Sequence, residues 1–252
     1  MVARHDQTTD PVLLDGLLQA RRGTAFFARK LNELTDAELD GESLLPGWTR
    51  RHVVAHVGYN ARAVARLVEW AATGVETPMY PSVDVRNHEI EFGATLSPIA
   101  LRNLFEHSAV HLNVEWRDLP AANWHHKVKT VQGRTVPAEE TVWMRTREVW
   151  VHAVDLDNGA TFVDIPAPVL ERLLKDIIGA WRTRGTDKDL LVEVTGQPST
   201  MTYGDTAATA PTVVSGSLPA ITQWATGRGT HGTTATRDGE AVTPSPLAPN
   251  WI

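Results

Sequence analysis

A glutamate and a histidine stand four residues apart in the stretch REVWVHAVDL, which is otherwise largely apolar. Residues with this spacing lie one turn apart on the same face of a helix, so Glu148 and His152 would point in the same direction. A carboxylate in such surroundings is destabilising unless a cation or hydrogen-bond donors offset its charge. The pair therefore predicts either part of a metal site or a buried ion pair.

A second pair of residues with the same spacing, His52 and His56, occurs in TRRHVVAHVGYNA. His56 lies near the middle of the apolar face of this segment, whereas His52 lies closer to its solvent-exposed start. Facing helices of a bundle can bring such groups together in the core. One histidine from this helix, with Glu148 and His152 from the other, gives the ligand set of a His₂Glu zinc site with an open fourth position.

The pattern alone leaves alternatives open. Glu148 could pair with an arginine such as Arg145 or Arg50, and an inward histidine is often only a hydrogen-bonded core residue. The E-x-x-x-H spacing by itself arises by chance in many helices. Four further histidines have too few evident partners for a metal site and are expected on helix surfaces or in loops: His107, His111, His125 and His126.

Four long helices are expected to position these groups. They run from Pro11 to about Leu34, from Thr49 to about Thr73, from Ser97-Pro98 through Trp116, and from Pro137-Ala138 through the stretch with Glu148. Proline, serine and threonine at the starts and Gly74 at one end support these limits. The crossover ETPMYPSVDVRNHEIEFG could hold a short helix, and KVKTVQGRTVPAEE could form a hairpin around Gln132-Gly133. Four helices with one extended crossover predict a bundle.

The pattern of the sequence changes after Asp164-Ile165-Pro166, from long helical segments to shorter candidate helices and strands. A helix from Val169 to Arg182 precedes the candidate strands DLLVEVTG, MTYG and PTVVSG, and another helix spans Leu218 to Ala225. The tail HGTTATRDGEAVTPSPLAPNWI is expected to be a surface-hugging or mobile end. The fold class is therefore α+β, with a helical bundle over residues 1–160 and a smaller α/β domain over residues 161–252.

Two arginines could bind an acidic substrate. Arg228 stands between two glycines directly after a helix, and a guanidinium matches a carboxylate with two parallel hydrogen bonds. The alternative is an ordinary helix C-cap with an exposed arginine. Arg86, in DVRNHEIEFG, is a weaker candidate of the same kind.

Composition excludes several classes of function. A net charge of −6 and a pI near 5.9 give no electrostatic case for binding nucleic acid or an anionic membrane. No apolar run is long enough to span a bilayer, and the first residues lack the apolar region of a signal peptide, so a cytoplasmic monomer is expected. The chain contains no cysteine, which excludes disulfides and a cysteine nucleophile of its own.

Two motifs carry a family resemblance. LPGWTRRHVVAHVGYNA, followed by WMRTREVWVHAVDL, resembles the DinB-like metal-binding four-helix bundles and, more closely, the mycothiol-dependent maleylpyruvate isomerases. The similarity extends over nearly the whole chain and includes ETPMY, QGRTVPAEETVWMR and VVSGSLPAITQWATGRG. It implies that the metal ligands are His56 rather than His52, together with Glu148 and His152. It also implies that Arg228 handles the substrate, whereas the contacts to the thiol cofactor cannot be transferred.

The resemblance implies a zinc enzyme, or one using another divalent metal, that isomerises maleylpyruvate to fumarylpyruvate in gentisate breakdown. Addition of the mycothiol thiolate to the conjugated system would turn the double bond into a single bond. Rotation and loss of the thiol would then give the trans isomer. A chain without cysteine needs such an external thiol.

Three other functions remain as alternatives: a mycothiol S-transferase for electrophile detoxification, a non-catalytic metal-binding protein of stress response, and a hydrolase that uses metal-bound water. The glutamate ligand and a carboxylate-binding arginine favour the isomerase, because its substrate is a dicarboxylate.

Overall fold

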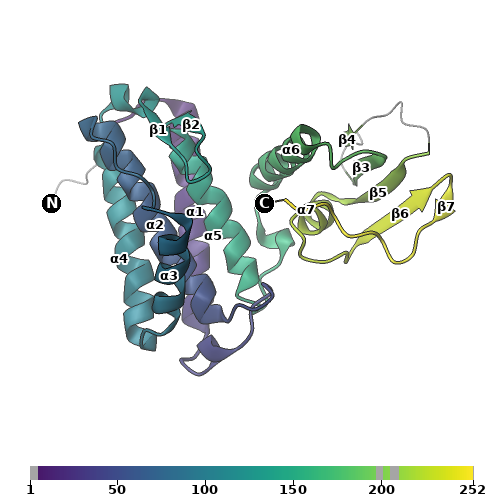
Figure 1. Ribbon diagram of the computed structural model, residues 1–252, viewed down its shortest axis with the longest axis horizontal. Helices are drawn as coiled ribbons and strands as arrows, with labels where there is room; N and C mark the ends of the chain where they lie inside the picture. Colours follow the sequence, from purple (N-terminus) through teal and green to yellow (C-terminus); the bar gives the residue numbers. More distant parts are fainter. Residues whose placement is uncertain (1–4, 197–200, 205–209, 252) are drawn as a thin grey trace. The chain divides into compact units, whose positions relative to one another are not determined.

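The computed structural model describes residues 5–196, 201–204 and 210–251. The chain forms two compact units, Met1–Ala160 and Thr161–Ile252, and each is considered by itself (Figure 1). Within the described ranges, no helix combines the length and the apolar character needed to cross a membrane.

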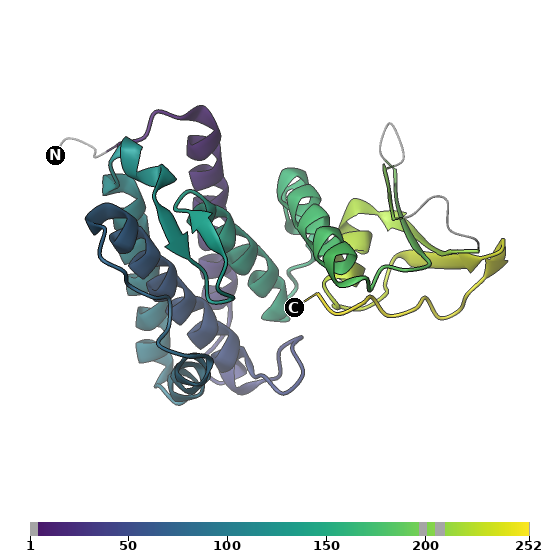
Figure 2. The same ribbon diagram turned by 45° about the horizontal axis from the view of Figure 1, so that its top comes forward.

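The first unit is a helical bundle with an additional helix in its long crossover (Figures 1 and 2). The four long helices are α1 (Pro11–Glu33), α2 (Arg50–Thr73), α4 (Pro98–Asp118) and α5 (Glu140–Asp155). The crossover contains α3 (Val83–Ala94), twelve residues long, which packs on α2. Two 3₁₀ turns cover Glu38–Asp40 and Ala121–His125.

Local signals in the sequence set the helix limits. Thr49 and His52 form a reciprocal capping box at the start of α2, and Gly74 ends this helix in the left-handed conformation with φ 75°. The side chain of Ser97 accepts a hydrogen bond from the backbone N–H of Ala100 at the start of α4. Asp10 caps α1 in the same way. The expected limits of these three helices are thus confirmed to within a residue or two.

A small antiparallel hairpin precedes α5. Strands β1 (Lys127–Lys129) and β2 (Thr135–Pro137) pair through the buried residues Val128 and Val136. The predicted hairpin is confirmed, but the predicted helix start at Pro137-Ala138 is too early. Pro137 belongs to β2, opposite Lys127, and α5 begins only at Glu140.

The second unit packs two helices with a five-stranded mixed sheet. Its helices are α6 (Ala167–Arg184) and α7 (Leu218–Ala225), preceded by the 3₁₀ turn Phe162–Asp164. The strands, in sheet order, are β4 (Met201–Gly204), β3 (Leu190–Thr195), β5 (Thr212–Ser217), β6 (Thr233–Arg237) and β7 (Glu240–Ala241). Only β3 and β5 run parallel. Val192, Val214 and Ala235 face one another across neighbouring strands and are buried.

The described part of the tail packs on the second unit, which is the first of the two expected alternatives, but it also contains a hairpin that was not predicted. Its first part forms the hairpin β6–β7, whose turn residues Asp238 and Gly239 have positive φ angles of 52° and 80°. An Asp-Gly pair favours such a turn. Farther on, the indoles of Trp224 and Trp181 donate to the carbonyls of Pro246 and Asn250.

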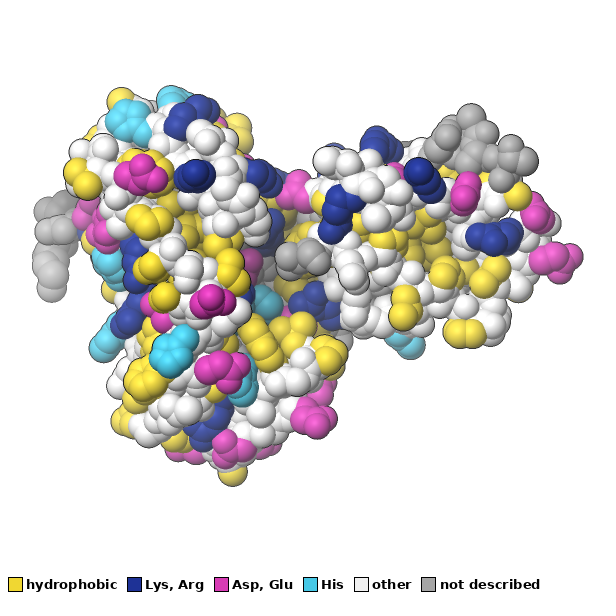
Figure 3. All heavy atoms as spheres, viewed as in Figure 1, with side chains coloured by type: hydrophobic (Ala, Val, Ile, Leu, Met, Phe, Trp, Pro, Cys, Tyr) yellow, Lys and Arg dark blue, Asp and Glu magenta, His cyan; other side chains and the backbone are white. Residues whose placement is uncertain are grey.

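Charges on the visible face are mixed. Figure 3 shows basic and acidic side chains interspersed on each unit. This distribution agrees with the modest net charge of −6 and shows no basic surface of the kind that binds nucleic acid on that face.

Candidate metal centre

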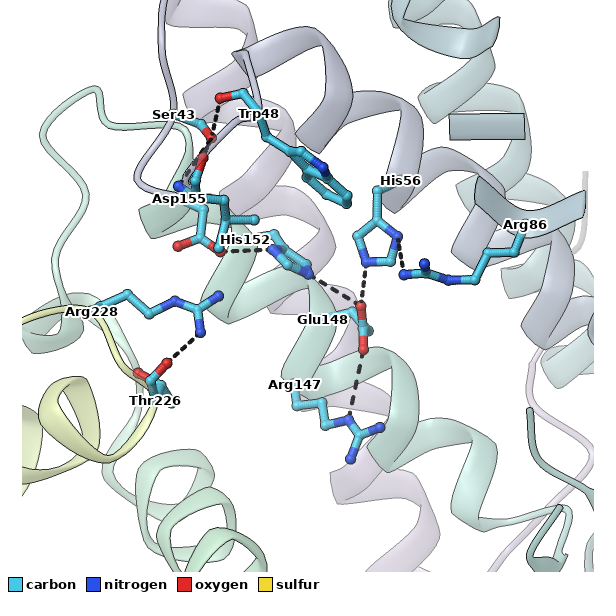
Figure 4. Close-up of polar contacts among 11 residues, drawn as sticks. Ser43, Trp48, His56, Arg86, Arg147, Glu148, His152, Asp155, Thr226 and Arg228 are labelled. Atoms are coloured by element: carbon cyan, nitrogen blue, oxygen red, sulfur yellow. Dashed lines mark hydrogen bonds and ion pairs between the residues drawn. The ribbon is translucent and has the colours of Figure 1, made fainter. Parts of the chain in front are cut away.

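Three side chains from two helices converge in the bundle. His56 lies in the N-terminal half of α2, and Glu148 and His152 lie one turn apart on α5 (Figure 4). The Nε2 atom of His56 is 2.9 Å from Oε2 of Glu148, and Nε2 of His152 is 3.3 Å from the same oxygen. One ligand atom from each residue lies within 4.8 Å of the others. The donor set, two imidazole nitrogens and a carboxylate oxygen, suits zinc.

The site is largely screened from solvent. The side chains of His56, His152 and Glu148 are 8%, 13% and 18% exposed. The two imidazole rings meet edge to face, with centroids 4.7 Å apart. Side chains buried in this way in a bundle core form a preorganised ligand set, in which Glu148 is the most exposed member.

The three groups shift one another's proton affinity. Burial would raise the pKa of Glu148, but hydrogen bonds from His152 and His56 outweigh burial and hold this pKa well below its usual value. Burial would lower the pKa of His152, but hydrogen bonds to Asp155 and Glu148 raise it to about 8. Burial lowers the pKa of His56, against the opposing hydrogen bond to Glu148. Without a metal, the site therefore holds a carboxylate, an imidazolium at neutral pH and a neutral imidazole.

A buried carboxylate orients one ligand. Nδ1 of His152 donates to Oδ2 of Asp155 at 2.8 Å, and the side chain of Asp155 has no solvent exposure. Such a contact fixes the ring orientation and keeps the proton on Nδ1, which leaves the Nε2 lone pair for a metal. Asp155 was missed in the sequence, although its position three residues after His152 was a usable signal.

The other ligand, His56, contacts an arginine and a tryptophan. Nη2 of Arg86 in α3 donates to Nδ1 of His56 at 3.4 Å (Figure 4). Arg86, the weaker of the two substrate-binding candidates, therefore contacts a candidate metal ligand. The Trp48 ring lies with its centroid 5.6 Å from that of His56. The side chain of Trp48 is half-buried and lies beside this ligand.

The arginines proposed as ion-pair partners of Glu148 have other partners. Nη1 of Arg145 donates to a backbone carbonyl and to a side-chain amide of α2. Arg50 donates to the carbonyls of Leu156 and Asp157. The arginine next to the carboxylate is Arg147, whose Nε is 3.8 Å from Oε1 of Glu148. Glu148 thus has an arginine ion-pair partner, Arg147 instead of Arg145 or Arg50, in addition to the two imidazoles.

The remaining histidines lie elsewhere. His52 serves the helix cap, where its Nδ1 contacts the hydroxyl and backbone N–H of Thr49. His111 is half exposed, and its Nε2 lies 3.4 Å and 3.3 Å from carboxylate oxygens of Glu69 and Glu115. This second group of three possible ligands is on the surface, where such clusters are common without a metal.

Arg228 lies in the second unit, in a tightly turned segment. Its neighbours Gly227 and Gly229 have φ angles of 77° and 100°, which favour glycine. Nη1 of Arg228 donates to the carbonyl of Thr226 at 2.6 Å, and the Arg228 carbonyl accepts from the amide of Gln223 at 3.0 Å. The segment follows α7 directly, as the sequence indicated.

The arrangement defines a class: an α+β protein with a helical bundle that carries a candidate His₂Glu centre, followed by a small α/β unit. Residues 20–157 match the family model described as the mycothiol maleylpyruvate isomerase N-terminal domain, and residues 164–246 match the MDMPI C-terminal domain. The chain belongs to the mycothiol-dependent maleylpyruvate isomerase family.

Solved structures agree with this assignment. A crystal structure of the mycothiol-dependent maleylpyruvate isomerase is 48% identical, with a TM-score of 0.89, over 95% of this chain and 97% of that one. A mutant of that isomerase, in which a histidine is replaced by alanine, is 47% identical, with a TM-score of 0.88 over the same shares. Among curated proteins, no sequence matches the chain.

Proposed function

We propose that this protein isomerises maleylpyruvate to fumarylpyruvate with mycothiol as the thiol cofactor and a divalent metal, zinc, at His56, Glu148 and His152. The observation that carries the proposal is the convergence of these three ligands in a chain 48% identical to a structurally characterised isomerase. The same resemblance points to gentisate cleavage as the source of the substrate and to a cytoplasmic location.

The donor chemistry fits the metal. Two imidazoles and one carboxylate leave a fourth position for an external ligand, as in catalytic zinc sites. A bound zinc ion would supply a positive charge that lowers the pKa of a nearby thiol or polarises a substrate oxygen. Mycothiol would supply the nucleophilic sulfur that a chain without cysteine lacks.

The protein's own residues would hold the ligands and the substrate. Asp155 keeps His152 in the metal-binding orientation. A neutral His56 that gives Nε2 to a metal carries its proton on Nδ1. The present contact from Arg86 to that atom would then be lost, because two donors would face each other. Arg86 would be released to bind a substrate carboxylate.

Arg228 is the second proposed substrate-binding residue. It lies in a turn between two glycines whose positive φ angles, 77° and 100°, favour glycine. Arg228→Lys keeps the positive charge but loses the two-pronged geometry that matches a carboxylate. We expect a rise in KM for maleylpyruvate, with the zinc content unchanged.

An ultraviolet assay with purified protein, maleylpyruvate and mycothiol tests the function. Isomerisation should require both the thiol and the metal, and it should fall at least about a hundredfold in His56→Ala and Glu148→Ala. The matched control is His52→Ala, which removes a histidine from the same helix whose polar contacts are with Thr49 at the helix cap and with Glu91. Full activity without a thiol would exclude the mechanism, and formation of a stable thiol conjugate would indicate an S-transferase.

A further inference from the structure

Arg145 is a buried arginine without a carboxylate partner among the described residues. It is 1% exposed and lies on α5 among apolar side chains of the bundle. Its Nη1 donates to the backbone carbonyl of Val57 at 2.7 Å and to Oδ1 of Asn60 at 2.9 Å. Its Nη2 is buried and has no hydrogen-bond partner in the structure.

The contacts of Arg145 lie directly beside the candidate metal ligands. Arg145 precedes Glu148 on α5 by three residues, which is about one helical turn. Its two acceptors belong to α2: Val57 follows His56 directly, and Asn60 stands one turn farther along. The guanidinium thus connects the two ligand-bearing helices one turn away from the ligands themselves.

This arrangement is unfavourable for stability alone. Burial lowers the pKa of Arg145 to about 10, with the nearby Glu148 acting in the opposite direction. Replacing a buried ion pair by apolar side chains of similar volume is often neutral or stabilising, and a buried charge without a counter-ion is less favourable still. The unpaired Nη2 adds to the unfavourable contribution. A role other than packing would account for such a residue at this place.

We propose that Arg145 is a positioning residue of the metal centre: by connecting α5 to Val57 and Asn60 of α2, it sets the spacing between His56 and Glu148. The inference depends on the proposed metal site but not on the identity of the substrate. A zinc site requires ligand distances within a few tenths of an ångström, so a small displacement of α5 against α2 would weaken binding.

Zinc affinity of the full-length protein, measured by competition with a chelator, tests this role. We expect Arg145→Met to weaken zinc binding at least about tenfold, which is the lower end of the effect of residues that support metal ligands. Substitution with Co²⁺ adds a spectroscopic readout, because its visible absorption reports the ligand geometry. That spectrum should change in Arg145→Met.

Arg102→Met is the matched control. Arg102 on α4 also connects two helices through carbonyls, donating to Leu31 at 2.6 Å and to Leu34 at 2.7 Å, and it forms an ion pair with Asp36 at 3.5 Å. Its loss should destabilise the apo protein while the zinc affinity and the cobalt spectrum stay as in the wild type. This difference separates positioning of the site from general stabilisation of the bundle.

Milder variants keep the test decisive if Arg145→Met does not fold. Asn60→Ala removes one acceptor and retains the guanidinium, and it should weaken zinc binding severalfold. Arg145→Lys retains the charge and should restore part of the affinity. A folded Arg145→Met or Asn60→Ala protein with the zinc affinity and cobalt spectrum of the wild type would overturn the positioning role of Arg145 and leave the metal centre unaffected. Failure of the wild-type protein to bind zinc would overturn the metal centre and, with it, this role.

Discussion

At the scale of single residues, the centre depends on groups that do not themselves contact a metal. His152 offers Nε2 because its other nitrogen is held by the fully buried Asp155. Glu148 remains ionised because two imidazoles donate to it despite burial. The ligand set therefore already has the charge that metal binding requires, except for one proton on His152, and the proton of His56 must move from Nε2 to Nδ1.

Asp155→Asn should weaken metal binding by about ten- to a hundredfold, because it removes the negative charge that orients His152. It should also lower the pKa of His152, since the hydrogen bond to Asp155 contributes to its elevation. Chelator competition measures the first effect, and a histidine NMR titration of the apo protein measures the second. Asp15→Asn, at an exposed position of α1, is the control and should change neither.

The proton that His152 must lose predicts that the zinc affinity depends on pH. His152 has a pKa of about 8 in the metal-free protein and must lose its proton to bind a metal. As pH falls below that value, the apparent affinity should decrease about tenfold per pH unit, and it should level off above it. Calorimetry in buffers of different ionisation enthalpy should detect release of about one proton per zinc near neutral pH. A zinc affinity that is constant from weakly acidic to weakly basic pH would contradict this assignment.

At the scale of elements, close helix packing determines where the site lies. Gly23 on α1 faces α5, where a Cβ atom would come within 2.6 Å of both Val149 and Trp150. These two residues follow Glu148 directly. The absence of a side chain on α1 therefore permits the helix that carries two of the ligands to approach closely.

Gly23→Ala should consequently destabilise the protein by about 1–3 kcal/mol, even though alanine favours helices. Gly16→Ala on the same helix is the matched control, because its Cβ would meet Val142 at an ordinary 3.4 Å. It should be neutral or stabilising by about 0.5–1 kcal/mol. Denaturant unfolding of the two variants measures the change in the free energy of unfolding and its sign. Equal effects at both positions would show that the α1–α5 approach is not tight.

The sequence predicted the elements whose signals are local. Caps, turn residues and apolar periodicity located the long helices, and the spacing of Glu148 and His152 placed both on one face. His56 lies nearer the middle of the apolar face than His52, but the choice between them rested on the family resemblance, because residues four apart share one face of a helix. The role of Arg145 was not predictable, since its partners on α2 are distant in sequence. The β6–β7 hairpin in the tail was not predicted, although its Asp238-Gly239 pair is a local turn signal.

At the scale of the whole molecule, the proposed chemistry is divided between the two units. The three metal ligands and Asp155 belong to the unit Met1–Ala160, and Arg228 belongs to the unit Thr161–Ile252. A bundle with its own core should fold without the second unit, because most helix stability comes from tertiary packing of apolar faces. Metal binding and catalysis should therefore be separable.

A fragment of residues 1–160 should bind zinc with an affinity within about threefold of the full-length protein, since the ligands and their supporting groups are all present. It should have no measurable maleylpyruvate isomerase activity, because the proposed substrate contact at Arg228 is absent. Chelator competition and the ultraviolet assay measure the two properties on the same sample. His56→Ala in the fragment is the control and should abolish the zinc binding. An active fragment would exclude a substrate role for Arg228, whereas a folded fragment that does not bind zinc would show that the second unit is needed to form the site.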